Sequence, residues 1–262
     1  MSSLLVLDVD NTILEKRKLD NIAYEKVSSD VFGRTISMLF HPINRDSDNE
    51  FAKYTNYEIW EYKIKQILES GEILKIGQLE INNINQIDIS NLVSRLGEET
   101  IKHLETGKVS DFVNILINPS SLRYLAKEVF AVSIASSGPR RIQENLLERL
   151  GFYEVVDKGL CVFAEEGEDK GSLIYEATGK YFDKFSAIPH VTIYIGDSER
   201  DTKAIKYLNE LSRLNYKGIG VLTGVSSRKD LENNGADLVV SNLKDKENLK
   251  KVRDYLRRLK NV

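Results

Sequence analysis

The stretch Leu4-Leu5-Val6-Leu7-Asp8-Val9-Asp10-Asn11-Thr12 decides the fold. Its four consecutive apolar residues predict a short strand that is buried on both faces, as in a parallel sheet. Two carboxylates follow at once, and Asn11 and Thr12 end the strand. Ligands of open α/β sheets bind beyond the carboxyl ends of the strands. The stretch alone therefore leaves two interpretations open, a plain polar turn or a nucleophilic or metal-binding aspartate.

A calcium-binding loop that begins at Asp8 is excluded. The sixth position of such a loop requires glycine and the twelfth requires glutamate. These positions hold Ile13 and Leu19 in this chain.

The composition is ordinary for a globular protein. The chain has 262 residues, of which 41% are hydrophobic and 29% charged, and its formal net charge is −3. This charge gives no general reason to expect nucleic acid or a membrane surface as a partner. We find no signal peptide and no apolar run long enough to span a bilayer. The single cysteine, Cys161, has the sequence context of a core residue, so we expect a cytoplasmic protein. The oligomeric state is not predicted.

Strands and helices alternate from residue 128 onward. Strands are expected at 129–135, 191–195, 218–222 and 237–240. Helices are expected at 140–150, at 170–181 and at 245–259, and a further helix follows 196–201 and ends at about 211. Such alternation is typical of a parallel sheet with right-handed crossovers and helices on both faces.

The segment 15–118 has a different character. Helical spacing of apolar residues occurs at 23–31, 57–70 and 89–105, whereas 71–88 is either a small hairpin or an irregular loop. We therefore predict a mainly helical domain over 15–118, inserted after the first strand of an α/β core formed by 1–14 and 119–262.

Polar side chains follow three of the expected strands and are predicted to meet at one sheet edge. They are Asp8 and Asp10 after the first strand, Ser136 after the second, and Asp197 and Asp201 after the third. Carboxylates that lie together stay ionised only when cations share their site. We therefore expect Mg²⁺, which prefers oxygen ligands, and at least one lysine, for which Lys170 is the candidate.

These residues resemble the four motifs of the haloacid dehalogenase-like superfamily. The motifs, in the family's order, are Asp8-Val-Asp10-Asn-Thr12, Ser136, Lys170 and Gly196-Asp197-Ser-Glu-Arg-Asp201. The resemblance implies a Rossmann-like doubly wound parallel sheet and, in the insert, a C1-type helical cap like that of phosphoglycolate phosphatase-like members. One departure is Asn11, where the family often has glycine.

The resemblance implies a role for each motif residue. Asp8 would attack phosphorus and form an aspartyl-phosphate, while Asp10 would protonate the leaving oxygen and then activate water. The metal would be held by Asp8, by Asp197 and by the backbone carbonyl of Asp10. Ser136 and Lys170 would bind the transferred phosphoryl oxygens.

The remaining motif residues would act indirectly. Asp201 would hold a water of the metal or support its ligands, although an ordinary helix-start residue is the alternative. Thr12 would stabilise its loop by hydrogen bonding.

The two phosphate-binding residues have alternatives in the sequence. Ser137 could replace Ser136, which could instead cap the next helix, and Lys180 or Lys184 could replace Lys170.

A Mg²⁺-dependent phosphatase acting on a small phosphorylated metabolite is the leading functional prediction. Asp10 argues against a dehalogenase, which needs no acid at that position. A phosphomutase uses the same residues and stays an alternative. A phospho-accepting signalling domain would be far shorter, and a catalytically dead scaffold would not need every catalytic group. Phosphoglycolate and sugar phosphates are suggested as substrates by family analogy alone.

Overall fold

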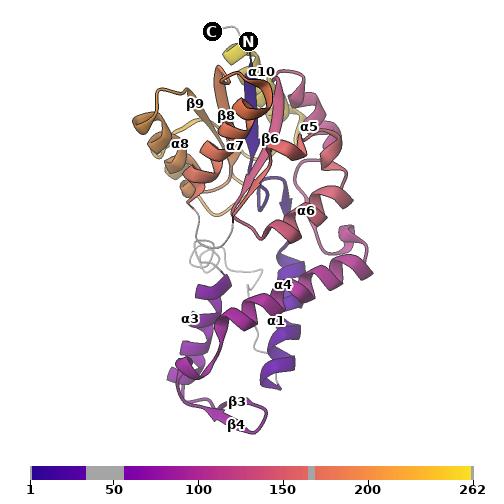
Figure 1. Cartoon of the computed structure of the whole chain (residues 1–262), viewed down its shortest axis with the longest axis vertical. Coiled ribbons are helices and arrows are strands. Elements are labelled where there is room, and N and C mark those ends of the chain that lie inside the picture. The colour runs from indigo at the N-terminus through magenta and orange to yellow at the C-terminus, as the bar shows by residue number, and fades with distance from the viewer. Residues whose placement is uncertain (1, 34–55, 165–168, 261–262) are drawn as a thin grey trace. The chain divides into compact units, whose positions relative to one another are not determined.

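Two compact units make up the chain, for which the computed structural model describes residues 2–33, 56–164 and 169–260 (Figure 1). One unit comprises Met1–Glu15 with Asn114–Val262, and the other comprises Lys16–Val113. This division differs by a few residues from the expected one after 14 and 118. The cause is a short antiparallel pair, β2 (Leu14–Glu15) with β5 (Asn114–Ile115), which assigns both connecting segments to the first unit.

A parallel sheet with β1 near its centre forms the core of the first unit. The strand order is β10-β9-β8-β1-β6-β7, and every adjacent pair is parallel. The strands are β1 (Ser3–Leu7), β6 (Ala131–Ser136), β7 (Val162–Phe163), β8 (Val191–Gly196), β9 (Tyr216–Val221) and β10 (Ala236–Val240). All five residues of β1 are buried, as expected for a strand that is covered on both faces. Because later strands are added on both sides of β1, the doubly wound α/β fold predicted from the sequence is confirmed.

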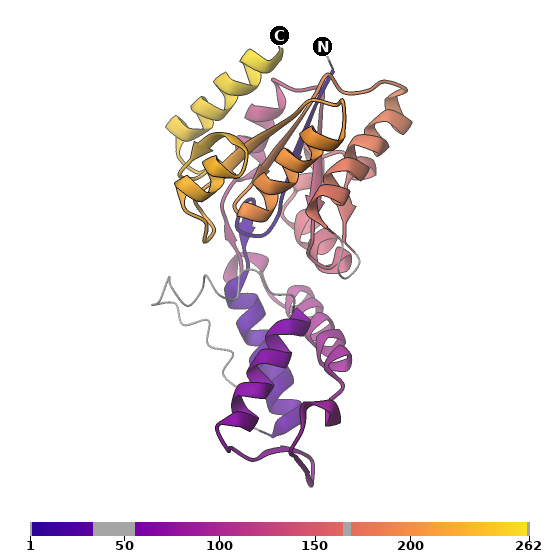
Figure 2. The ribbon, with the colours of Figure 1, turned by 90° about the vertical axis from the view of Figure 1, so that its left-hand side faces the viewer.

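Helices cover both faces of this sheet. They are α5 (Pro119–Ala126), α6 (Arg140–Arg149), α7 (Lys170–Phe185), α8 (Glu199–Leu211), α9 (Arg228–Asn233) and α10 (Lys246–Lys260). Leu4 and Val6 of β1 pack in one apolar cluster with α7 and α8. Figure 2 shows α10 on the opposite side of the sheet from α7. Since residues of a strand alternate between faces, the other side chains of β1 point toward the α10 side.

The second unit is mainly helical in its described part. Its helices are α1 (Arg17–Phe32), α3 (Asn56–Glu69) and α4 (Ile89–Thr106), and residues 34–55 of the expected insert lie outside the described ranges. Trp60 is fully buried, with its ring 5.3 Å from that of Tyr24 and 6.4 Å from that of Phe32. Residues 71–88 contain a hairpin of β3 (Leu74–Ile76) and β4 (Leu79–Ile81), followed by a 3₁₀ turn over Ile84–Gln86.

The elements that the sequence did not predict are short. The strands β2, β5 and β7 have two residues each, and α9 has six. Such lengths show no measurable period in a sequence. Cys161 is buried as expected, and burial raises the pKa of its thiol to about 12, which makes it a poor nucleophile. No helix in the described ranges combines the length and the apolar character that crossing a membrane requires.

Glu128 connects the segment after α5 to α10. Its buried carboxylate accepts hydrogen bonds from Arg253 at 2.6 Å and from Arg257 at 3.1 Å. The hydrogen bonds from Arg257 and Arg253 hold the pKa of Glu128 below its ordinary value of 4.5, against the opposing effect of burial. The stabilisation by this carboxylate is therefore complete above pH 4.5 and is lost as the pH falls through the lower pKa of the folded state.

We expect Glu128→Gln to lower the free energy of unfolding at neutral pH by about 1–3 kcal/mol, because two charge-assisted hydrogen bonds are lost. The difference from the unsubstituted protein should shrink at about pH 3, which denaturant unfolding at both pH values measures. The control is Glu154→Gln, because Glu154 pairs with Arg123 at the surface, where ion pairs contribute little. An equal loss at both pH values would contradict the assignment.

Candidate active site

Three neighbouring strands end at the expected site. Asp8 follows β1, Ser136 is the last residue of β6, and Asp197 follows β8. Because β1 hydrogen-bonds to both β6 and β8, the carboxyl ends of these strands are adjacent. All three side chains are buried at this edge of the sheet.

A cluster of three carboxylates and one ammonium group lies at this edge. Asp8, Asp197 and Asp201 each contribute an oxygen, and these oxygens lie within 4.8 Å of one another. The Nζ of Lys170 is 2.9 Å from Oδ1 of Asp8 and 3.5 Å from Oδ1 of Asp201. Among the residues that the structure describes, one ammonium group faces three carboxylates in this cluster, so negative charge is in excess. Buried oxygen donors of this kind fit Mg²⁺.

The protonation of the cluster reflects the same imbalance. Burial raises the pKa of Asp8 to about 7; Lys170 opposes this shift, while Asp201 and Asp10 add to it. Burial, followed by the charges of Asp201 and Asp8, also raises the pKa of Asp197. Burial alone would lower the pKa of Lys170, but the neighbouring carboxylates outweigh this effect and raise it. The ammonium group therefore stays charged. A divalent cation would relieve the repulsion among the carboxylates.

Asp201 is held by the start of α8 and by a buried phenol. Its Oδ2 accepts hydrogen bonds from the backbone N–H of Ser198 at 2.9 Å and from the Ser198 hydroxyl at 2.7 Å. The Tyr194 hydroxyl lies 3.2 Å from Oδ1 of Asp201 and 3.1 Å from the carbonyl oxygen of Ala135. Asp201 thus takes part in a capping box and also reaches the cluster, so both roles considered for it are compatible with its position. Gly196 allows this approach, because a Cβ there would lie 2.5 Å from Cγ of Asp201.

The loop after β1 is fixed by two contacts. Thr12 donates from its hydroxyl to Oδ1 of Asp197 at 3.4 Å, and Thr223 donates to the carbonyl oxygen of Asn11. Asn11 has a left-handed backbone with φ 56°. Asparagine tolerates this conformation better than most residues, which explains how it replaces the glycine that the family often has.

The structure distinguishes among the lysines and serines that the sequence left open. Lys170 contacts Asp8, whereas Lys180 donates to the carbonyl oxygen of Cys161 and Lys184 pairs with Asp157. The residue that precedes α6 is Pro139, with no side-chain capping bond, so Ser136 does not cap that helix. The Ser136 hydroxyl instead accepts a hydrogen bond from the N–H of Gly138 at 3.3 Å.

Two residues near the cluster were not predicted from the sequence. Gln143 of α6 donates from Nε2 to Oδ2 of Asp10 at 3.0 Å. Gly224 lies in the loop after β9, and a Cβ there would lie 1.8 Å from Oδ2 of Asp197. A polar residue on the apolar side of α6 is a sequence signal for Gln143. Gly224 has no such signal, because its contact depends on how the loop folds back.

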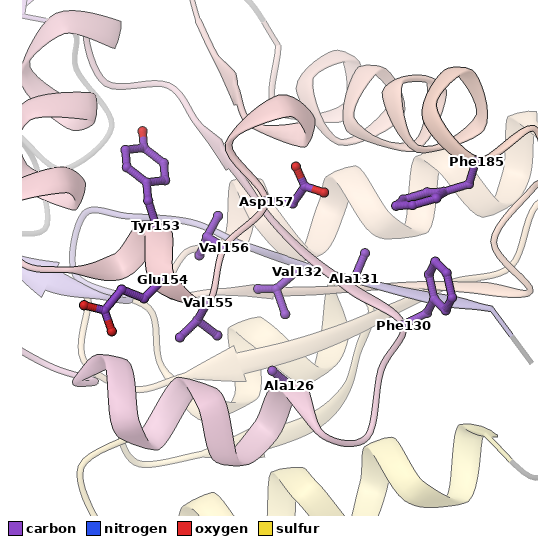
Figure 3. A pocket seen from close by; sticks show the side chains of 10 residues that line it. All are labelled: Ala126, Phe130, Ala131, Val132, Tyr153, Glu154, Val155, Val156, Asp157 and Phe185. Carbon is purple, nitrogen blue, oxygen red and sulfur yellow. The ribbon is translucent and has the colours of Figure 1, made fainter.

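A pocket of about 340 Å³ lies at the other end of β6 (Figure 3). It is lined by Ala131 and Val132, the first residues of the strand that ends at Ser136, and by the rings of Phe130 and Phe185, which meet edge to face. None of the expected site residues lines it. The carboxylate cluster therefore stays the candidate active site.

Comparison with known protein families shows which family the chain belongs to. The sequence profile of the haloacid dehalogenase-like hydrolases matches residues 5–210, a range that contains Asp8, Ser136, Lys170 and Asp197. The chain belongs to this family. The family and the enzyme type expected from the motifs, a haloacid dehalogenase-like phosphatase, are thereby confirmed.

Solved structures of this family share the fold over nearly the whole chain. A haloacid dehalogenase-like hydrolase of Streptococcus pneumoniae is 14% identical, with a TM-score of 0.60 over 97% of this chain and 98% of that one. A candidate β-phosphoglucomutase of Thermotoga maritima is 17% identical, with a TM-score of 0.60 over 98% and 99%. CbbY of Rhodobacter sphaeroides, in complex with phosphate, is 14% identical, with a TM-score of 0.61 over 94% and 96%. At these identities the similarity concerns the fold. No curated protein sequence matches the chain.

Proposed function

We propose that this haloacid dehalogenase-like hydrolase is a Mg²⁺-dependent phosphatase that cleaves a small phosphomonoester through an aspartyl-phosphate on Asp8. The observation that carries the proposal is the ion pair of Asp8 with Lys170 inside the buried carboxylate cluster, with Asp10 two residues away. A buried carboxylate that faces an ammonium group is suited to attack a phosphoryl group, because the ammonium offsets the charge of the incoming phosphate.

The first step transfers the phosphoryl group to the enzyme. A carboxylate oxygen of Asp8 forms a bond to phosphorus, and the bond from phosphorus to the ester oxygen breaks. Asp10 gives its proton to the departing oxygen, which leaves as an alcohol. Lys170 and the Ser136 hydroxyl bind the transferred oxygens and stabilise the charge that develops on them.

The second step returns the enzyme to its starting state. Asp10, now a carboxylate, removes a proton from water as the water oxygen attacks phosphorus. The bond from phosphorus to Asp8 breaks, and inorganic phosphate is released. Asp8 and Asp197, with the backbone carbonyl of Asp10, would hold the metal, and Asp201 would support it from α8. Mg²⁺, when bound, would supply positive charge for the phosphoryl oxygens.

A phosphomutase is the second candidate, because one structure that shares the fold is a candidate β-phosphoglucomutase. A mutase would use the same residues but return the phosphoryl group to an organic acceptor instead of water. Incubation of the purified protein and Mg²⁺ with a panel of phosphorylated metabolites, including phosphoglycolate and sugar phosphates, tests the proposal. Release of inorganic phosphate supports the phosphatase, whereas isomerised sugar phosphate without phosphate release would support the mutase.

Gly224→Ala is expected to lower kcat/KM for 4-nitrophenyl phosphate by at least about tenfold, because the added Cβ must displace the carboxylate of Asp197. The apparent affinity for Mg²⁺ should fall as well. Gly179→Ala is the matched control, since a Cβ at this position of α7 meets nothing within 4 Å. Both variants are compared by steady-state kinetics over a Mg²⁺ titration. Equal rates for the two would show that Asp197 tolerates the displacement.

A further inference from the structure

The inward face of α6 carries a glutamine that the mechanism above does not use. Gln143 is fully buried, and its neighbours on that face are Ile142, Leu146 and Leu147. A buried amide is unfavourable unless its polar atoms are hydrogen-bonded. An apolar side chain would suit this position better if packing were its purpose.

The hydrogen bond of Gln143 has a defined direction. Oδ2 of Asp10 lies 3.0 Å from the side-chain nitrogen of Gln143, and an amide nitrogen can only donate. The amide group therefore donates. Among the described residues, none hydrogen-bonds the amide oxygen, although it is buried. The side chain thus satisfies its donor toward Asp10 while its acceptor stays unsatisfied, which identifies the donor as the useful atom.

The surrounding backbone fixes the amide group in this position. The backbone N–H of Gln143 donates to the carbonyl oxygen of Pro139 at 3.1 Å in the first turn of α6. On the other side, a Cβ at Gly138 would lie 2.1 Å from Nε2 of Gln143. Glycine at 138, two residues after Ser136, therefore leaves the space that the amide occupies.

We propose that Gln143 is a positioning residue for the acid–base group Asp10, an inference that rests on the proposed function. The amide N–H holds Oδ2, so that Oδ1 is the oxygen that exchanges a proton with the leaving group and then with water. Ser136 ends β6 and Gln143 lies in the next helix, α6, so one segment of the chain positions both the phosphate-binding serine and Asp10.

The leaving group of the substrate provides the test. Phenyl phosphate needs a proton on its departing oxygen, whereas 4-nitrophenolate leaves readily without one. We expect Gln143→Met to lower kcat/KM for phenyl phosphate by about tenfold or more, and for 4-nitrophenyl phosphate by less than about threefold. This ratio kcat/KM reports only the steps up to departure of the alcohol, so slower hydrolysis of the phosphoenzyme does not disturb it. Glu148→Gln, at an exposed position of the same helix, should leave both values unchanged.

A double variant distinguishes a positioning role of Gln143, which acts through Asp10, from a role in packing alone. In an Asp10→Asn background, Gln143→Met should lower kcat/KM for phenyl phosphate no further, because the group that it positions is absent. Equal losses for the two substrates, or additive losses in the double variant, would overturn the proposal. If Gln143→Met does not fold, as judged by circular dichroism, Gln143→Leu also removes the donor without adding a charge and carries the same expectations. An unsubstituted protein that hydrolyses neither substrate would refute the proposed function itself, and the inference with it.

Discussion

Asp8→Asn is expected to lower hydrolysis of 4-nitrophenyl phosphate by at least about 10³-fold, the largest effect of any single substitution in this chain. The amide of asparagine is not a nucleophile, so the aspartyl-phosphate cannot form. Lys170 also loses the carboxylate that lies 2.9 Å from its Nζ. Steady-state rates at saturating substrate measure the effect.

The control for this prediction is Asp183→Asn. Asp183 is exposed on α7, away from the cluster, and its replacement should leave the rate unchanged. Circular dichroism and thermal unfolding of both variants establish that each is folded. An Asp8→Asn variant that is folded and retains a rate within about threefold of the unsubstituted protein would rule out Asp8 as the nucleophile.

Removal of the metal is the second large effect. Excess EDTA should reduce phosphate release to the background rate, and added Mg²⁺ should restore it. The physical reason is the excess of negative charge in the described part of the cluster, where Asp8, Asp197 and Asp201 lie around the ammonium group of Lys170. Without a cation, the site repels the phosphate dianion that it has to bind. Full turnover in EDTA would contradict the metal requirement.

Thermal unfolding measures the binding of Mg²⁺ independently of enzymatic activity. At about a hundredfold excess over its dissociation constant, a ligand stabilises the folded state by about 2.7 kcal/mol. We therefore expect Mg²⁺ to raise the Tm of the unsubstituted protein by several degrees. The shift should be lost in Asp197→Asn, which removes one carboxylate of the cluster, and should persist in Asp183→Asn.

The positions of the candidate site residues could be predicted where such a residue ends a strand or directly follows one. Asp8, Ser136 and Asp197 each come after an apolar run, and parallel topology then places them at one edge. Lys170 is less conspicuous in the sequence, but it begins α7 after the capping residue Asp169, a start that the sequence also predicts.

Contacts between residues that are far apart in the sequence could not be predicted. The carboxylate of Asp10 meets Gln143, a residue 133 positions away, and Asp197 meets the loop of Gly224. The pairing of β2 with β5 likewise joins residues about a hundred positions apart through strands of two residues each. No local periodicity reports such contacts. The C1 type of the cap and a cytoplasmic location stay predictions from the sequence.

Trapping of the phosphoenzyme tests the central claim most directly. The unsubstituted protein and Asp8→Asn are mixed with 4-nitrophenyl phosphate and Mg²⁺, quenched in acid within one turnover, digested and analysed by mass spectrometry. The mechanism predicts one added phosphoryl group on the peptide that contains Asp8, located on Asp8 by fragmentation and absent from the variant. A phosphoryl group on another residue, with none on Asp8, would contradict it.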